Sequence, residues 1–253
     1  MSVGEDQIDE RGPPINKRIN DRSIKGVFFD AGGTLFDVRG GVGDHYSRLA
    51  GRYGVEADPE FLNRRFQEVF AETHPPAFPG ADKHEINGFE RRWWHQLVRK
   101  VFDGISFPAF ESFFDDVYRY FEGSEAWVLF PETIDVLEDL HKGPYYIGII
   151  SNFDSRLESV CQSLGIRHYF KEITLSSRQG AAKPSPEIFS NALKEAALLP
   201  SESIFVGDSL DNDIPGALAI GMFPLLVDRE GRYPGREGLD RISDLRGVLK
   251  YLF

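Results

Sequence analysis

The stretch VFFDAGGTLFD, residues 27–37, decides the fold that we expect for this chain. Its first three residues, Val27 to Phe29, form a short apolar run that stops at Asp30, before a turn with two glycines. Such a run is typical of a parallel strand that is buried on both faces. Four later runs have the same character, and they lie at residues 146–150, 173–175, 204–206 and 225–227.

Helical segments separate the later strands. Apolar residues recur at helical spacing over residues 157–164, and Gly165 follows where a helix commonly ends. Ser185 and Pro186 form a typical helix start. Two further helices are expected at residues 131–142 and 245–252. Alternating strands and helices predict an α/β fold with a Rossmann-like, doubly wound parallel sheet.

A long helical segment interrupts this alternation. In residues 38–128 the apolar residues recur only at helical spacing, and they form two apolar faces at 94–101 and 110–121. We therefore expect an all-α cap domain at residues 38–128. The Rossmann-like core would then consist of residues 24–37 and 129–253.

The composition argues against several classes of protein. Lys and Arg total 29 against 40 Asp and Glu, and the formal charge of −11 would repel a nucleic-acid backbone. No run of about 18 apolar residues occurs, so no membrane span is expected. Residues 1–23 are polar, and we expect a flexible tail there rather than a signal peptide. With Cys161 as the single cysteine, a cytoplasmic protein is expected.

Polar residues at the ends of the strands form the candidate site, because ligands of parallel α/β sheets bind beyond the carboxyl ends of the strands. Asp30 follows the first strand, and Ser151 and Asn152 follow the second. Lys183 precedes a helix start, and Asp208 follows the fourth strand. One carboxylate at a strand end is more often a loop cap than a nucleophile. The ordered set at successive strand ends favours a functional site.

This ordered set resembles the haloacid dehalogenase superfamily, from about Lys25 to the C-terminus. The four motifs of that superfamily occur in order, at Asp30 with Gly33-Thr34-Leu35, at Ser151, at Lys183, and at Asp208 with Asp213. Within the superfamily, residues 150–158 and Arg92-Trp93-Trp94 are similar to the group named haloacid dehalogenase-like hydrolase domain-containing protein 3, also called rhythmically expressed gene 2-like.

The resemblance implies a hydrolase of small phosphorylated molecules that uses an aspartate nucleophile and Mg²⁺. Asp30 would attack the substrate, and Lys183 would hold Asp30 and the phosphoryl oxygens. Thr34 and Ser151 would donate hydroxyl hydrogen bonds, and the backbone near Asn152 would donate an N–H. The implied magnesium ligands are Asp30, the backbone carbonyl of Gly32, Asp208 and, through a bound water, Asp213.

One position departs from the phosphatases of the superfamily. They carry a second aspartate two residues after the nucleophile, where it acts as general acid and base, and here that residue is Gly32. Losing a general acid/base typically costs about 10²- to 10⁴-fold in rate, so the resemblance predicts a weak phosphatase.

Gly32 leaves two alternatives open. A metal-free 2-haloacid dehalogenase also lacks that aspartate, and Arg64 or Arg65 would then bind the substrate carboxylate. A pseudo-enzyme that binds a metabolite or a protein partner is the other alternative. The acid pair Asp208 and Asp213 favours Mg²⁺, because clustered carboxylates are costly unless a cation balances them.

Other residues are weaker candidates. Asp37 is expected to cap a turn, and Trp93 and Trp94 to pack in the interior of the cap. The loop at residues 73–84 contains His74 and His84, which would supply the missing acid/base if the loop closed over a cleft, although a surface loop is at least as good a reading. Residues 40–43, GGVG, are interpreted as a hinge of the cap. Cys161 is expected to be a buried, inert thiol.

Overall fold

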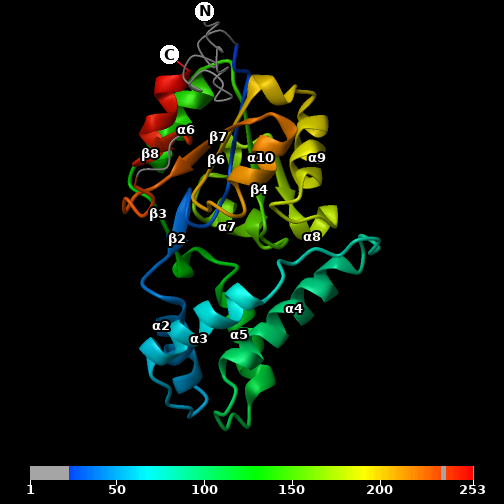
Figure 1. Ribbon diagram of the computed structural model, residues 1–253. Coiled ribbons are helices and arrows are strands. Elements are labelled where there is room, and N and C mark those ends of the chain that lie inside the picture. Colours follow the sequence, from blue (N-terminus) through cyan, green and yellow to red (C-terminus); the bar gives the residue numbers. More distant parts are fainter. Residues whose placement is uncertain (1–22, 235–237, 253) are drawn as a thin grey trace, which may run out of the picture.

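The computed structural model describes residues 23–234 and 238–252, so the expected tail lies outside the described residues apart from Ser23. Six parallel strands form one sheet (Figure 1). Their order is β5 (Glu172–Leu175), β4 (Tyr146–Ser151), β1 (Gly26–Phe29), β6 (Ser203–Gly207), β7 (Phe223–Val227) and β8 (Arg241–Ile242). The five predicted strands are confirmed. The sixth, β8, has two residues and is too short to give a pattern.

The strand order reverses at β1. Phe29 pairs with Ile149 of β4 on one side and with Val206 of β6 on the other. The chain adds β4 and β5 on the first side, and then β6, β7 and β8 on the second. A crevice opens beyond the carboxyl ends of the strands at such a reversal, so the residue after Phe29 stands at its centre.

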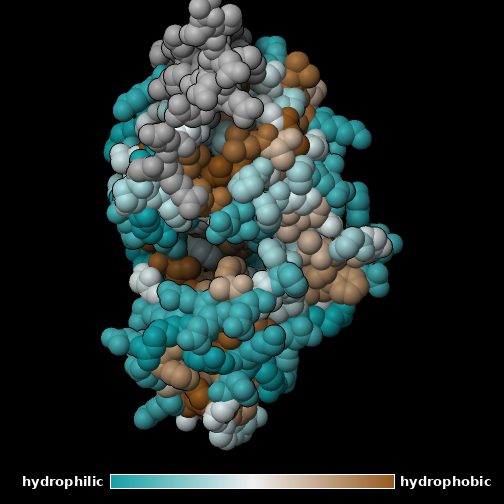
Figure 2. Space-filling view, viewed as in Figure 1, coloured by the Kyte–Doolittle hydropathy of each residue, from teal (hydrophilic) through white to brown (hydrophobic). Residues whose placement is uncertain are grey.

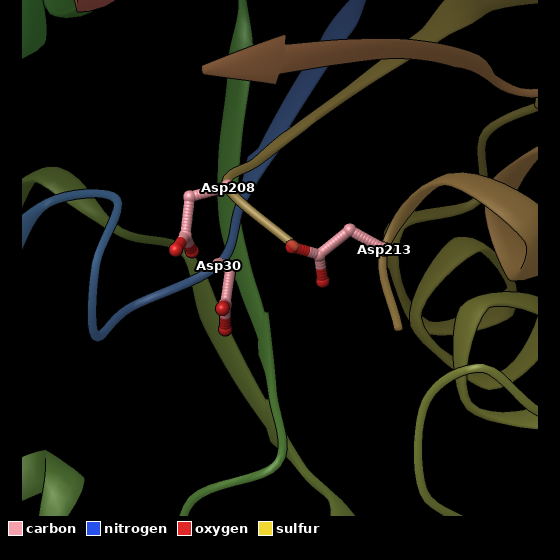
Figure 3. Close-up of side chains that lie close together, drawn as sticks. All are labelled: Asp30, Asp208 and Asp213. Carbon is pink, nitrogen blue, oxygen red and sulfur yellow. The ribbon is translucent and has the colours of Figure 1, made fainter. Parts of the chain in front are cut away.

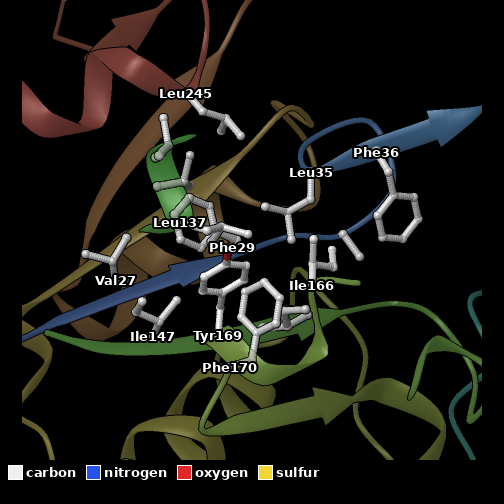
Figure 4. Packing of buried hydrophobic residues seen from close by; sticks show 14 of the residues in the cluster. Val27, Phe29, Leu35, Phe36, Leu137, Ile147, Ile166, Tyr169, Phe170 and Leu245 are labelled. Carbon is white, nitrogen blue, oxygen red and sulfur yellow. The ribbon is translucent and has the colours of Figure 1, made fainter. Parts of the chain in front are cut away.

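Helices cover both faces of the sheet, as the continuous apolar runs require. Val27 and Phe29 pack in a cluster with Leu137 and Leu245 (Figure 4). Phe28 packs on the other face with Phe189. The first face carries α6 (Thr133–Lys142), α7 (Leu157–Ser163) and η4 (Leu245–Tyr251), and the second carries α9 (Pro186–Ala196) and α10 (Ile214–Ile220). Shorter helical turns are α8 (Ser176–Gln179), η2 (Arg167–Tyr169) and η3 (Pro200–Glu202).

The last predicted helix differs in type from the expectation. Residues 245–251 form a 3₁₀-helix rather than an α-helix. Gly247 lies in its middle and packs against Ile242, where a Cβ would come within 2.5 Å of the Ile242 side chain. Glycine weakens an α-helix because it loses more backbone entropy than other residues do.

Four helices form an insert between the first strand and the rest of the sheet. They are α2 (Val42–Gly51), α3 (Pro59–Glu72), α4 (Ile86–Val101) and α5 (Phe110–Tyr120), and residues 42–120 are called the helical insert below. The insert has a hydrophobic cluster of its own, which includes Leu49, Leu97 and Phe113 (Figure 1). Its two connections to the sheet form a small antiparallel ribbon of β2 (Phe36–Val38) and β3 (Trp127–Leu129). The short helical turn η1 (Ser124–Ala126) comes directly before β3 in the chain. Strands of three residues were not expected from the sequence.

The loop between α3 and α4 is attached to the core and does not lie over the cavity. Ser176 of α8 donates a hydrogen bond of 2.7 Å from Oγ to the carbonyl of Pro76. Gly180 lies so close to the same loop that a Cβ there would come within 2.9 Å of Pro79. The loop is therefore a second attachment of the insert, far from the ribbon of β2 and β3.

Two of the glycines at residues 40–43, Gly41 and Gly43, lie close to α3, and the hinge interpretation of this segment stays a prediction. A Cβ at Gly43 would lie 2.2 Å from the carbonyl oxygen of Pro59 and 2.5 Å from the amide of Asn63. The Gly43 N–H donates to Asn63 Oδ1 over 2.7 Å. Glycine at this position lets α2 and α3 approach each other closely.

Replacing Gly43 by alanine is expected to destabilise the protein by about 1–3 kcal/mol, because the added methyl group meets backbone atoms that cannot move aside. Urea denaturation measures the effect. The control is Gly51→Ala in the same helix, where a Cβ meets no atom within 4 Å. Alanine there should leave stability unchanged or raise it by up to about 1 kcal/mol. Equal effects of the two changes would contradict the packing explanation.

Candidate active site

Three carboxylates lie together at the reversal point of the sheet. Asp30 directly follows β1, Asp208 directly follows the neighbouring β6, and Asp213 stands at the start of α10. One oxygen from each lies within 4.8 Å of the other two (Figure 3). The parallel pairing of β1 with β6 brings the first two carboxylates together, because both strands end at the same edge.

Lys183 supplies the positive charge of this cluster. Its side chain is 2% exposed, and its Nζ lies 2.7 Å from Asp30 Oδ1 and 2.6 Å from Asp213 Oδ1. Burial by itself lowers the pKa of Lys183, but the charges of Asp213 and Asp30 outweigh it and raise the pKa. The ammonium group therefore stays charged and fixes the position of the Asp30 carboxylate.

Asp213 differs from the expected second metal ligand. Its side chain is fully buried, with Oδ1 at Lys183 and Oδ2 accepting a hydrogen bond of 2.9 Å from the amide of Ser209. Both oxygens are thus occupied by protein donors. In this structure Asp213 holds Lys183 and the turn after β6.

Asn152 positions Lys183 through a pair of hydrogen bonds. Its Nδ2 donates to the carbonyl of Lys183 over 2.9 Å, and its Oδ1 accepts from the amide of Lys183 over 2.8 Å. This use of the side chain was not predicted, because two segments separated by thirty-one residues make the pair. Ser151 is buried at the end of β4 and lines the cavity described below. Substrate contacts of Ser151 and Asn152 remain predictions.

Thr34 was expected to donate a hydroxyl hydrogen bond, and in this structure the acceptor is Asp208. Thr34 is fully buried, and Oγ1 donates to Asp208 Oδ1 over 3.1 Å. The neighbouring Gly33 has φ +80°, and a Cβ there would lie 2.5 Å from Asp208 Oδ2. The turn after Asp30 therefore accommodates the Asp208 carboxylate, and Thr34 is a positioning residue.

The electrostatics of the cluster favour a cation. Burial and the neighbouring charge of Asp30 raise the pKa of Asp208 to about 6. A divalent cation with oxygen ligands would relieve this repulsion, and the free oxygens of Asp30 and Asp208 are the donor type that Mg²⁺ prefers. These residues fit a magnesium site. The expected contribution of the Gly32 carbonyl remains a prediction, and Gly32 lies in the wall of the same cavity.

A cavity of about 370 Å³ extends from the carboxylates into the helical insert. Asp30, Asp208 and Lys183 lie at its core end. Trp93 and Trp94 pack against the hydrophobic cluster of the insert, as expected, and they also line this cavity. The helical period places both on α4, but it does not reveal that this part of the helix faces the core.

A buried network that the sequence analysis missed joins the core to the insert. Arg156 forms a salt bridge of 2.6 Å with Asp154, and its Nη1 donates to the carbonyl of Tyr118 over 3.1 Å. Trp94 Nε1 also donates to Asp154. Glu90, which is 1% exposed, accepts hydrogen bonds from the amide and hydroxyl groups of Ser155. The polar residues Asp154, Ser155 and Arg156 after β4 could be recognised in the sequence, but the sequence does not show that their partners lie on α4 and α5.

Several weaker candidates lie away from the cavity. Arg64 is exposed, and Arg65 pairs with Glu68 over 3.0 Å on the surface, so the expectation that either binds a substrate carboxylate is wrong. His74 and His84 are exposed and do not line the cavity either.

The structure also shows where two other candidates, Asp37 and Cys161, lie. Asp37 is the middle residue of β2 and lies in the cavity wall, so the expectation that it caps a turn was wrong; its Oδ1 accepts a hydrogen bond of 2.7 Å from the amide of Val38. Cys161 is buried as expected, and burial raises the pKa of its thiol to about 12.

Comparisons with known proteins agree with this geometry. The sequence model of the haloacid dehalogenase-like hydrolase family matches residues 24–221. The chain belongs to this family. It is 30% identical over 209 residues to human haloacid dehalogenase-like hydrolase domain-containing protein 3, which covers 81% of this chain and 82% of that protein.

One further relative is named as a phosphatase, and one solved structure of similar fold is named as a dehalogenase. Glyceraldehyde 3-phosphate phosphatase of Methanopyrus kandleri is 29% identical, over 85% of this chain and 88% of that protein. The crystal structure of 2-haloacid dehalogenase from Pseudomonas syringae has a TM-score of 0.62 at 24% identity, covering 90% of this chain and 98% of that chain. The fold is therefore common to proteins of both names. In the part of the chain that the structure describes, none of the helices has the length and apolar character needed to cross a membrane.

The raised pKa of Asp208 predicts a stability change with pH in the metal-free protein. The folded state binds the proton more tightly than the unfolded state, whose carboxyl pKa is near 3.8. The stability from this group is therefore complete below about pH 4 and is lost as the pH rises through about 6. Burial raises the pKa of Asp213 as well, and its effect has the same sign.

We therefore expect the melting temperature in EDTA to fall between pH 5 and pH 7, and to fall less in Asp208→Asn. Thermal denaturation followed by circular dichroism measures both slopes. An identical slope in the variant would show that Asp208 titrates normally in the fold.

Proposed function

We propose that this hydrolase is a Mg²⁺-dependent phosphatase of small phosphate monoesters, with Asp30 as the nucleophile. The observation that carries the proposal is the contact of Asp30 with Lys183 beside Asp208, at the closed end of the cavity. Lys183 orients the Asp30 carboxylate and offsets its charge, so that it approaches an anionic phosphoryl group. The related phosphatase of Methanopyrus kandleri supports the same chemistry.

The reaction would take place in two steps. A carboxylate oxygen of Asp30 forms a bond to phosphorus while the bond to the alcohol oxygen breaks, and the departing alkoxide takes a proton from water. Water then attacks the phosphorus of the aspartyl phosphate, which releases inorganic phosphate and restores Asp30. The free hydroxyl of Ser151, at the end of β4, would donate to a phosphoryl oxygen.

Asp30 and Asp208 would hold the magnesium ion, with the Gly32 carbonyl as a further ligand. The bound ion would supply positive charge between the nucleophile and the phosphoryl oxygens. Thr34 keeps Asp208 in place through its hydrogen bond, and Asp213 keeps Lys183 in place. Asp213 would contribute to the ion through a bound water only if its contact with Ser209 or Lys183 opened.

The insert would act as the cap of this enzyme. We propose residues 38–128 as the cap and residues 24–37 with 129–253 as the core, because the two parts have separate hydrophobic clusters. The charge of −11 and the single cysteine favour a cytoplasmic enzyme with a small-molecule substrate, and not a nucleic-acid or membrane partner.

Metal-free dehalogenation is less well supported as a function. The two cations in the cavity wall, Lys183 and Arg156, are both paired with carboxylates, so neither is available for a substrate carboxylate. A metal-free site would also leave Asp30 and Asp208 close together without a balancing ion. The third alternative is a binding protein without turnover, and the absence of a side chain at Gly32 is the argument for it.

We expect Mg²⁺-dependent hydrolysis of p-nitrophenyl phosphate, because its activated leaving group needs no general acid. Asp30→Asn should lower the rate at least about 100-fold, since the amide is not a nucleophile. Release of p-nitrophenol with Mg²⁺ and with EDTA measures both effects. Asp211→Asn is the control, because Asp211 is exposed and near Asp208 in sequence but outside the carboxylate cluster. Turnover that persists in Asp30→Asn would refute the proposed nucleophile.

Gly32→Asp is expected to increase hydrolysis of an unactivated ester such as butyl phosphate by at least about 10-fold. A Cβ at Gly32 meets no atom within 4 Å, and its φ lies outside the left-handed region, so the site accepts a side chain. The new carboxyl group would protonate the leaving alkoxide.

Gly32→Asn is the matched control for size and should give no gain, because an amide cannot donate this proton. Release of inorganic phosphate is the measurement. The rate with p-nitrophenyl phosphate should change much less than the rate with butyl phosphate. Equal gains with Asp and Asn would exclude an acid/base effect.

A further inference from the structure

The part of the cavity inside the insert has a different chemistry from the part at the carboxylates. Figure 2 shows a recess between the sheet and the insert, with hydrophobic residues at its rim. Every residue of the helical insert that lines the cavity is aromatic or valine. The charged groups of the cavity all come from core segments, such as Asp30, Asp37 and Lys183.

The aromatic rings of the wall form a connected surface. Phe66 stacks on Phe70 with centroids 5.4 Å apart, and Phe70 lies nearly parallel to Trp94 at 6.4 Å. Trp93 meets Trp94 edge to face at 4.8 Å. Phe70 is 45% exposed, so part of this surface is open at the rim of the cavity. Flat apolar groups bind well to such rings.

The indole and guanidinium groups of the wall are already paired. The indole N–H of Trp93 donates to the carbonyl of His74 over 2.9 Å, and that of Trp94 donates to Asp154. Arg156 is bound to Asp154 and lies with its guanidinium 4.0 Å from the centroid of the Tyr118 ring. These donors are therefore not free for a ligand, and a ligand hydroxyl or ammonium group that is buried against the aromatic rings would go unpaired, which weakens binding.

We propose that the alcohol part of the substrate is a flat, uncharged, apolar group of one or two rings, so that the substrate class is an aryl or arylalkyl phosphate. This assignment rests on the proposed phosphatase function for the position of the phosphate. The volume of about 370 Å³ is sufficient, because an apolar cavity of about 150 Å³ already holds benzene. Phosphorylated sugars and amines would place their polar groups against an insert wall made of aromatic and valine side chains.

Binding of phosphonates tests this inference without requiring turnover, because the carbon–phosphorus bond is not hydrolysed by this chemistry. Calorimetry with the wild-type protein and Mg²⁺ would compare benzylphosphonate, methylphosphonate and 2-aminoethylphosphonate. We expect benzylphosphonate to bind at least about 10-fold more tightly than the other two, from burial of the ring. Equal affinities, or no binding of any phosphonate, would overturn the inference.

Two exposed phenylalanines of α3 provide a matched pair of variants. Phe70→Ala removes a ring from the cavity wall and should lower the preference for benzylphosphonate at least about 3-fold, with methylphosphonate unchanged. Phe61→Ala removes a ring that is 36% exposed and does not line the cavity, so the preference should stay as in the wild type. The same loss in both variants would show that the effect is not local to the wall.

The same set of measurements separates the two proposals. Preferential binding of benzylphosphonate by a protein that hydrolyses no phosphate ester would refute the phosphatase and support the apolar ligand class. Hydrolysis of p-nitrophenyl phosphate by a protein with no preference among the phosphonates would support the phosphatase and refute the ligand class.

Discussion

The contact of one buried ammonium group with two carboxylates is the constraint on which the site depends. Lys183 lies between Asp30 and Asp213, and removing Lys183 would leave both carboxylates without their cation. The surrounding structure maintains this contact. Asn152 holds the backbone of Lys183, and the parallel pairing of β1 with β6 fixes the distance from Asp30 to Asp208. The sheet and the site are thus determined together.

The sequence predicts the core well because each strand is an apolar run that is buried on both faces. The same signal places Asp30 and Asp208 at one edge, since both follow such runs. This signal does not predict which hydrogen-bonding partner a polar side chain has in the fold. Thr34 was expected to donate a hydroxyl hydrogen bond, but its acceptor Asp208 was not predicted, because only the folded turn brings that carboxylate within reach.

The helical insert shows the same limit on a larger scale. The apolar face of α4 is visible in the sequence, but Trp94 lies where the insert meets the core, and a helical period does not distinguish an interior from a cavity wall. The fold also leaves the reaction open, because proteins named as phosphatases and as dehalogenases share it. The evidence on the type of reaction comes instead from Gly32 and from the pair of carboxylates, Asp30 and Asp208.

The attachment of the insert to the core has an evolutionary consequence. Two of its contacts are donated by core side chains, Ser176 and Arg156, to backbone carbonyls of the insert, at Pro76 and Tyr118. A backbone carbonyl is present whatever the side chain is. Mutations can therefore change the side chains that line the insert without removing these two contacts. Such an arrangement lets the lining of the cavity diversify among descendants while the insert stays attached beside Asp30.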